Sequence, residues 1–533
     1  MDIETRPRQR RNILIGLIVV LLAAGAVRGY LVATTEIVSR DGITFTKYAQ
    51  GLRTDPVGEM RRQDQHPLYP ATLLAAYSLV GPWLADEPVH AWPLAGQIAS
   101  LLGGLLVVWA AYALGRAMWD ERVGLTTALF AAMLPELCQV SANALSDGLH
   151  LGLYLWGLVA LLGAMRANRL GRLAAAAILS GLAFLVRPEG GSILAVGLAM
   201  VLTVGRGQGW PLRRRAAGVA ILLACFFAVA SPYMLAVGSV IQKKNVFELF
   251  GLDDLADASA PTGPIAANRS SIGSADYSPE VNAPVRGDLF QSVPVQVLYF
   301  WGRACRVVYL LLALPALAMQ LVPRPRGLKA IAIAALLHLS LVYALASSYG
   351  YLSLRHLLTL AVLTLPFAAA TFVWIVDQAS VRLAFGRDRR ARFVRPLVYL
   401  VGVVVVVAPT VPWMLRPIGG GKGYLVAAGR WLHHHSQPGE LVFTSRSRVA
   451  YYAERPMRVA PDTGSVKKVL AGIKAIKPDY YVVDQVHITA PHRNPDFFAG
   501  LESRPLRRRL ELIHEEPGPT GKVVIYRVKQ IGK

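Results

Sequence analysis

A polar segment between two apolar runs contains the first residues that could take part in chemistry. Residues 41–70 read DGITFTKYAQGLRTDPVGEMRRQDQHPLYP, with an acid at the start and several basic side chains after it. An ionised carboxylate at Asp41, kept charged by cations such as Lys47 and Arg53, could accept a proton from a hydroxyl group as a general base. The alternative is that Asp41 only ends a helix and meets solvent, and composition alone favours that interpretation.

The end of this segment combines a histidine, two prolines and a tyrosine. The residues HPLYP at 66–70 open an apolar run, 71–83, that is short for a membrane span. Proline at a helix start and an aromatic ring at a membrane surface suit a helix that lies in the interface, with His66 facing water and Tyr69 at the lipid boundary. A lone histidine is more often structural than catalytic, but the acid Asp64 close by favours a functional role.

A second carboxylate, Asp147, begins another apolar run. An isolated aspartate there would most simply cap a helix. If it faced the same cavity as Asp41, the two acids could share a proton, a divalent cation or a hydroxylated or aminated substrate. Arg187 and Glu189 flank a single proline in a short turn, which an ion pair between them could lock. We take Asp41 and Asp147 as the candidate catalytic residues, assign no metal ligands, and leave a divalent cation open as a cofactor.

Basic side chains near the ends of apolar runs could hold a phosphate group, arginine as a planar fork and lysine as a point charge. Some of them could instead extend along the membrane boundary to reach water. The candidate substrate-binding residues are Tyr48, His66, Tyr69, Arg187, Glu189, Lys243, Lys244, Arg355 and His356.

The composition indicates a polytopic membrane protein that holds these residues in place. Of 533 residues 54% are hydrophobic and 17% charged, and the mean hydropathy is +0.41. The net charge of +23 could suggest nucleic acid, but the basic residues form short clusters between apolar runs, as cytoplasmic loops facing anionic lipid do. We therefore expect a lipid bilayer and no nucleic acid as partner. There is no phosphate-binding glycine loop, HExxH or GxSxG motif, so nucleotide hydrolysis has no support.

Eleven apolar runs predict about eleven transmembrane helices. Alternate linkers carry the arginines, for example residues 6–11, 213–215 and 387–395, which places the N-terminus in the cytoplasm and the polar features on the other side of the cytoplasmic membrane. The predicted runs are 13–33, 92–115, 123–140, 145–165, 173–187, 190–205, 216–238, 294–322, 328–347, 353–376 and 393–413.

Two domains follow from this pattern. Residues 1–413 form a transmembrane domain, with a first outer loop at 34–91 that contains interfacial helices and a long outer loop at 239–293. From 414 to 533 the composition changes to that of a small extracytoplasmic α/β domain, with strands expected at 441–444, 480–483, 510–513 and 523–528 and a helix after Ser465.

The order of these motifs resembles the membrane-embedded GT-C glycosyltransferases, most nearly the branch with the protein O-mannosyltransferases and the aminoarabinose transferases of lipid A. The resemblance covers most of the chain. It rests on the first span, the acid Asp41, Tyr48-Ala49, HPLYP at 66–70, Asp147, Arg187-Pro188-Glu189, and LRHLL at 354–358 before a span containing Pro366.

The resemblance implies a fold and an activity. A GT-C enzyme of this branch transfers a sugar from a polyprenyl-phosphate donor to a lipid, glycan or protein acceptor on the periplasmic or luminal face of the cell envelope, generally with inversion. Asp41 takes the place of the catalytic acid of the first loop, Asp147 that of the second acid, and Arg355 that of the arginine before the late span. The sequence departs from the pattern at Gly42, where a second acid is frequent, and at Pro67, which stands for a double proline.

A transporter or flippase for a lipid-linked or anionic substrate is the alternative. Such a protein would favour charged or helix-breaking residues near the middle of the membrane. The polar groups of this chain gather at the outer ends of the apolar runs, which favours the enzyme.

Overall fold

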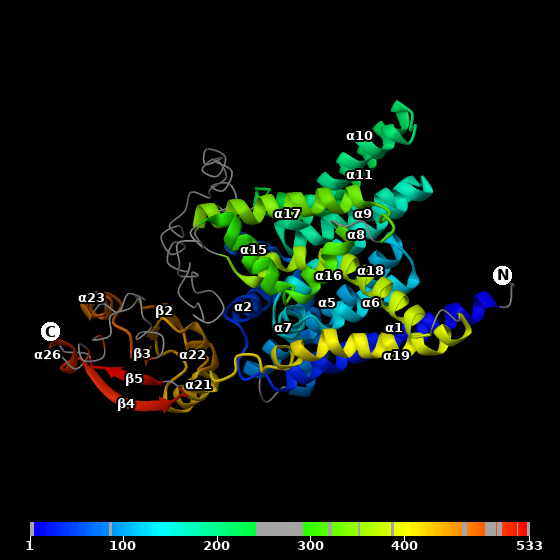
Figure 1. The fold of residues 1–533 in the computed structure, drawn as a ribbon. Helices are drawn as coiled ribbons and strands as arrows, with labels where there is room; N and C mark the ends of the chain where they lie inside the picture. The colour runs from blue at the N-terminus through cyan, green and yellow to red at the C-terminus, as the bar shows by residue number, and fades with distance from the viewer. Residues whose placement is uncertain are drawn as a thin grey trace.

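The computed structural model describes residues 5–84, 88–240, 292–317, 322–349, 352–384, 388–460, 466–485, 497, 501, 504–519 and 521–529. A large bundle of helices carries a smaller domain with a β-sheet at one end (Figure 1). Lys243 and Lys244 lie outside the described residues, so the structure says nothing of the site predicted for them.

The first half of the bundle contains the helices α1 to α11. They are α1 (Thr5–Ala33), α2 (Arg40–Thr54), α3 (Pro56–Arg62), α4 (Leu68–Val80), η1 (Gly81–Leu84), α5 (Pro88–Met118), α6 (Glu121–Met133), α7 (Pro135–Ala142), α8 (Asp147–Ala167), α9 (Leu170–Val186), η2 (Pro188–Gly191), α10 (Ser192–Gly207) and α11 (Leu212–Val237).

The second half of the bundle follows after residue 291. Its helices are α15 (Val293–Ala304), α16 (Val308–Leu317), α17 (Leu328–Tyr349), η5 (Leu354–Leu357), α18 (Leu358–Leu383), α19 (Asp388–Val407), η6 (Ala408–Thr410) and α20 (Val411–Met414). Among the described candidate spans, the one that contains α18 is the most enclosed, and α18 contributes many residues to the main hydrophobic cluster.

Within the described residues, each predicted apolar run is helical over most of its length, but the runs are not eleven straight spans. Within the described residues, eight helices are long and apolar enough to cross a membrane, and counting each bent pair as one span gives up to ten. The run at 123–140 breaks before Pro135 into α6 and α7, which differ in direction by 61°. The run at 294–322 breaks into α15 and α16 with a bend of 107°. Helix α9 has 17 residues, and at 1.5 Å per residue it is shorter than a typical hydrocarbon core of about 30 Å.

The first outer loop folds into the short helices α2, α3 and α4, and the helix predicted after HPLYP is present as α4. Ser39 caps α2, because its side chain accepts a hydrogen bond from the amide of Gly42. Helix α4 and η1 leave Leu79 and Trp83 largely exposed, as expected for a segment at a lipid boundary. The loop therefore has a defined structure on which Asp41 is held.

The C-terminal domain contains a five-stranded sheet with the order β2-β1-β3-β5-β4. The four predicted strands are present, and β2, which has three residues, was not expected. The elements are α21 (Gly423–His435), β1 (Val442–Thr444), α22 (Ser447–Tyr452), β2 (Met457–Val459), α23 (Val466–Ile476), β3 (Tyr480–Asp484), α26 (Arg504–Arg507), β4 (Leu510–Pro517) and β5 (Lys522–Val528). Strands β2, β1 and β3 are parallel, and β5 is antiparallel to β3 and β4.

The C-terminal domain packs directly on the first outer loop. Ile37 and Ile43 share a buried hydrophobic cluster with Leu425 and Val449 of the domain, and Tyr451 donates a hydrogen bond to the Val89 carbonyl at 3.3 Å. The composition changes near residue 414, but buried side chains of the first outer loop and of the C-terminal domain pack against one another across this boundary. The loop that carries Asp41 is thus held between the helical bundle and the sheet domain.

Candidate active site

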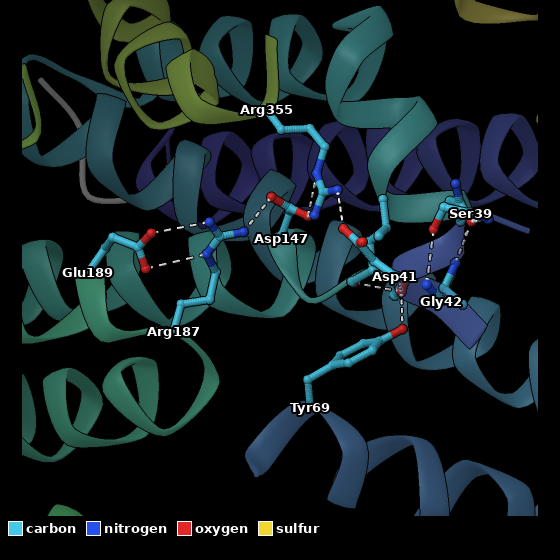
Figure 2. A network of polar contacts seen from close by, with 12 residues as sticks. Ser39, Asp41, Gly42, Tyr69, Asp147, Arg187, Glu189 and Arg355 are labelled. Carbon is cyan, nitrogen blue, oxygen red and sulfur yellow. Dashed lines mark hydrogen bonds and ion pairs between the residues drawn. The ribbon is translucent and has the colours of Figure 1, made fainter. Parts of the chain in front are cut away.

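Five charged side chains form a continuous network of ion pairs (Figure 2). Glu189 pairs with Arg187 at 3.2 Å, and Arg187 pairs with Asp147 at 2.9 Å. Arg355 then joins Asp147 at 2.8 Å to Asp41 at 2.7 Å. All five were candidates from the sequence, and the structure brings them together from four separate segments.

Each member of the network lies at the end of a helix. Asp41 is in the first turn of α2 and Asp147 in the first turn of α8, where the partial positive charge of a helix N-terminus stabilises a carboxylate. Arg187 lies between the end of α9 and the turn η2, Glu189 belongs to η2, and Arg355 belongs to η5 before α18. The site is therefore built from turns and helix ends that a rigid bundle positions.

Burial differs strongly along the network. The side chain of Asp147 is 5% exposed and that of Asp41 is 53% exposed, with the other three between these values. Asp147 accepts hydrogen bonds from both arginines, so its charge is compensated inside the protein. Asp41 is the member that solvent or a substrate can reach.

The network contains three carboxylates and two guanidinium groups and so has a net charge of −1 when all are ionised. Burial alone would lower the pKa of Arg187, but Glu189 and Asp147 outweigh that effect and leave its pKa raised. Arg187 therefore stays charged. A phosphate group that approaches Asp41 needs a further cation, because both arginines already bind carboxylates.

Tyr48 and Tyr69 are buried completely and are not at the lipid boundary where Tyr69 was expected. The Tyr69 hydroxyl donates to the Gly96 carbonyl at 3.0 Å and lies 2.8 Å from the Ser100 hydroxyl. Ser100 in turn donates to the Leu145 carbonyl at 2.8 Å, two residues before Asp147. Tyr69 thus connects the first outer loop to the start of α8, and a substrate could touch it only if the packing moved.

His66 is also buried, at 2% exposure, and does not face water as expected. Its Nδ1 donates to the Phe184 carbonyl at 2.6 Å, and the centroid of its ring lies 4.8 Å from that of Phe184 and 5.0 Å from that of Tyr233. Phe184 is one helical turn before Arg187. The sequence could not show this burial, because the aromatic neighbours come from α9 and α11.

His356 shapes the turn that carries Arg355. Ser353 and His356 form a reciprocal capping box in which the His356 Nδ1 accepts from the Ser353 amide at 3.2 Å. His338 of α17 lies 2.8 Å from the His356 carbonyl oxygen. These contacts hold η5 in place, so they fix the direction in which Arg355 extends.

Lys47 is a further cation near Asp41 that is not among the candidate substrate-binding residues predicted from the sequence. Arg40, Asp41, Thr44 and Lys47 occupy the outward face of α2, and the positions on either side of them are buried. Lys47 is six residues after Asp41, which is about 9 Å along the helix axis. Its side chain is accessible, yet partial enclosure by the protein lowers its pKa. Helical periodicity applied to α2 would have pointed to it.

The arrangement does not fit a metal ion shared by the two catalytic candidates. Among the described residues, no three His, Cys, Asp or Glu side chains are placed to hold a metal ion. Arg355 lies between Asp41 and Asp147 and bonds to both. Its guanidinium group therefore takes the position that a divalent cation bridging these carboxylates would need.

Comparisons with known proteins address the fold. The family model described as dolichyl-phosphate-mannose-protein mannosyltransferase matches residues 89–235, which include Asp147, Arg187 and Glu189. A search of curated proteins finds no match. The chain is similar to the archaeal oligosaccharyltransferase AglB from Archaeoglobus fulgidus in complex with an inhibitory peptide and a dolichol-phosphate. The TM-score is 0.61 and the identity 14%, over 98% of this chain and 75% of that one.

A second similar structure is ArnT from Cupriavidus metallidurans bound to undecaprenyl phosphate. The TM-score is 0.58 and the identity 14%, over 96% of this chain and 98% of the other. Both matches span the helical bundle and the sheet domain of the present chain. The chain is thus a multi-pass membrane protein with the GT-C fold that the order of its sequence motifs predicts.

Proposed function

We propose that the protein is a membrane glycosyltransferase that uses a polyprenyl-phosphate-linked sugar as donor. The acceptor is a hydroxyl or phosphate group of a lipid, glycan or protein on the extracytoplasmic face, and Asp41 is the general base. The observation that carries the proposal is the exposed carboxylate of Asp41, paired with Arg355, in a fold similar to structures that hold dolichol-phosphate and undecaprenyl phosphate.

For a hydroxyl acceptor, the reaction is a single displacement. Asp41 takes the proton of the acceptor hydroxyl, the oxygen forms a bond to the anomeric carbon, and the bond from that carbon to the phosphate oxygen breaks. The electron pair of the broken bond leaves with the polyprenyl phosphate, and the anomeric centre inverts. Arg355 lies beside Asp41 and can donate to the phosphate or to the acceptor oxygen, as a preorganised cation does in a partly enclosed site.

Asp147 has a different role because it is buried and bonded to two arginines. It fixes the positions of Arg187 and Arg355, so we assign it as the residue that organises the network. Glu189 completes the pairing of Arg187. Asp147 acts on the substrate through Arg355, and removal of its charge should disturb the orientation of that arginine.

Lys47 supplies the extra cation that the phosphate requires. It lies on the same exposed face of α2 as Asp41, and none of the described ion pairs includes its ammonium group. A compact ammonium group on a flexible stem can meet a phosphate as a point charge. Lys47 and Arg355 together would offset the negative charge that the leaving phosphate gains.

The membrane orientation follows from the basic linkers and belongs to this proposal. With the arginine clusters in the cytoplasm, the network and the sheet domain lie on the opposite side. The exposed apolar residues Leu79 and Trp83 then lie at the outer lipid boundary, in the same outer loop as Asp41. The lipid tail of the donor can thus stay in the bilayer while its phosphate reaches α2.

Purification of the full chain in mild detergent tests the proposal, with mass spectrometry of the lipids that remain bound. We expect a polyprenyl phosphate, with or without an attached sugar. Incubation of proteoliposomes with a radiolabelled polyprenyl-phosphate sugar should also release polyprenyl phosphate when an envelope extract provides acceptors. Bound phospholipid alone, together with no release from any polyprenyl-phosphate sugar tried, would contradict the proposal.

A further inference from the structure

A cleft lies apart from the charged network, between the end of α1 and the C-terminal domain. Its volume is about 400 Å³, and it opens broadly to solvent. Its walls come from the segment after α1, the start of α21 and the turn between β4 and β5. The side chains that give it chemical character are Glu36, Tyr424, Glu516, Pro517 and Pro519.

Glu36 forms one wall, and its charge is partly compensated. Its Oε2 accepts hydrogen bonds from the backbone amides of Lys422 at 3.1 Å and Gly423 at 3.0 Å, at the N-terminus of α21. Carboxylates are stabilised at this end of a helix. The carboxylate therefore keeps lone pairs for a ligand and does not need a full positive charge from it.

Glu516 also lines the cleft, and its carboxylate lies 3.1 Å from the His514 Nε2, within hydrogen-bond distance. The neighbouring Glu515 pairs with Lys522 and does not line the cleft. Adjacent residues of a strand point to opposite faces of a sheet. Two neighbouring glutamates thus differ in whether they can meet a ligand.

The remaining walls are ring surfaces. The turn at Gly518 packs closely on Tyr424, since a Cβ atom at Gly518 would lie 2.8 Å from the Tyr424 ring. The Tyr424 hydroxyl donates to Asp484 at 3.3 Å, which holds the ring in position. Pro517 and Pro519 add rigid apolar surface beside it. None of the described residues that line the cleft is a lysine or an arginine.

This combination identifies the chemistry of a ligand. Carboxylate oxygens accept strong hydrogen bonds from hydroxyl groups, and a flat ring with proline surfaces packs against C–H groups. An anionic ligand would meet two carboxylates and no cation. A ligand with many hydroxyl groups and apolar ring faces satisfies both kinds of wall, and a saccharide has this composition.

We infer that the cleft binds a neutral, hydroxyl-rich saccharide that forms part of the acceptor. The inference rests on the proposed function, because it names the acceptor class of that reaction. Glu36 is five residues before Asp41, so the two are at most about 18 Å apart along the chain. One extended saccharide can therefore occupy the cleft and present a hydroxyl group near Asp41.

The test measures binding by the fluorescently labelled full chain in detergent micelles. The probes are an array of neutral linear oligosaccharides and, beside it, an array of lysine-rich peptides. We expect saccharide binding that falls about tenfold in Glu516→Gln, which loses one charge-assisted hydrogen bond. Ala427→Trp, which fills the cleft from α21, should abolish it. The matched control Glu515→Gln should bind as the wild type does.

The outcomes separate this inference from the proposed function. Binding of lysine-rich peptides alone, no binding to either array, or equal losses in Glu515→Gln and Glu516→Gln would overturn the inference even if the protein transfers sugar. Asp41→Asn should keep saccharide binding and lose transfer. A wild-type protein that binds saccharides at the cleft but transfers no sugar would overturn the proposed function and leave the binding site standing.

Discussion

Replacing Arg355 by methionine removes the group that connects the two acidic candidates of the network. Arg355 donates to Asp147 from Nε at 3.2 Å and from Nη2 at 2.8 Å, and to Asp41 from Nη1 at 2.7 Å. Methionine has a side chain of comparable reach, so the variant loses the charge and these hydrogen bonds but keeps part of the packing.

The size of the effect follows from the burial of Asp147. Its side chain is 5% exposed, and in the variant Arg187 is its remaining ion-pair partner in the network. Removing one partner of a buried ion pair costs about 3–5 kcal/mol. Because Arg187 stays in place, we expect a loss near the lower end, about 3 kcal/mol in the free energy of unfolding.

Unfolding of the purified protein in a sodium dodecyl sulfate titration measures this loss. The matched control is Arg122→Met, which breaks a pair with Asp377 at the other end of α18, where the Arg122 side chain is 47% exposed. That control should lose at most about 1 kcal/mol. The double variant Arg355→Met/Asp147→Asn should lose less than the sum of its single variants, because asparagine needs no cation. Equal losses for Arg355→Met and Arg122→Met would refute the reasoning.

Further predictions concern individual side chains and metal ions. Lys47→Met should raise the KM for the donor about tenfold with a smaller change in kcat, and Lys47→Arg should restore part of the affinity; an unchanged KM in Lys47→Met would contradict the role of Lys47. Enclosure lowers the pKa of Lys47, so its ammonium group loses its proton at a lower pH than an ordinary lysine does. The donor affinity of the wild type should therefore fall as the pH rises, at pH values below the usual lysine range, and Lys47→Arg should remove this dependence. Incubation with EDTA should leave transfer unchanged, and activity that is lost and then restored by a divalent cation would oppose the position assigned to Arg355. Tyr69→Phe should lower the free energy of unfolding by about 1 kcal/mol, and a change in donor KM without a change in stability would instead place Tyr69 at the substrate.

Local sequence patterns predicted much of the fold. The prolines and apolar residues around 66–83 predicted α4, and the change of composition near residue 414 predicted the sheet domain. Pro135 marks the break between α6 and α7, but nothing in the sequence marks the second break. There Arg306 and Val307 have positive φ angles of 50° and 57°, which is unusual for a β-branched residue.

The sequence predicted which residues belong to the candidate site but not how their side chains pair. The distribution of basic residues among the loops predicts that Asp41, Asp147, Arg187 and Arg355 lie on one side of the membrane. Their pairing depends on contacts between residues up to 314 positions apart, which no local pattern encodes. The burial of His66 was not predicted for the same reason, because it depends on Phe184 and other rings from distant helices.

Transfer by the Asp41→Asn variant tests the central claim most directly. The assay compares wild-type and variant proteoliposomes supplied with the same polyprenyl-phosphate sugar and acceptor, with Asp55→Asn as the control. Asp55 caps α3 on the same loop, and asparagine also caps helices well. We predict that Asp41→Asn lowers turnover by about 10²–10⁴-fold, the usual contribution of a general base, while donor binding is retained and Asp55→Asn stays active. Turnover close to that of the wild type in Asp41→Asn would contradict the account.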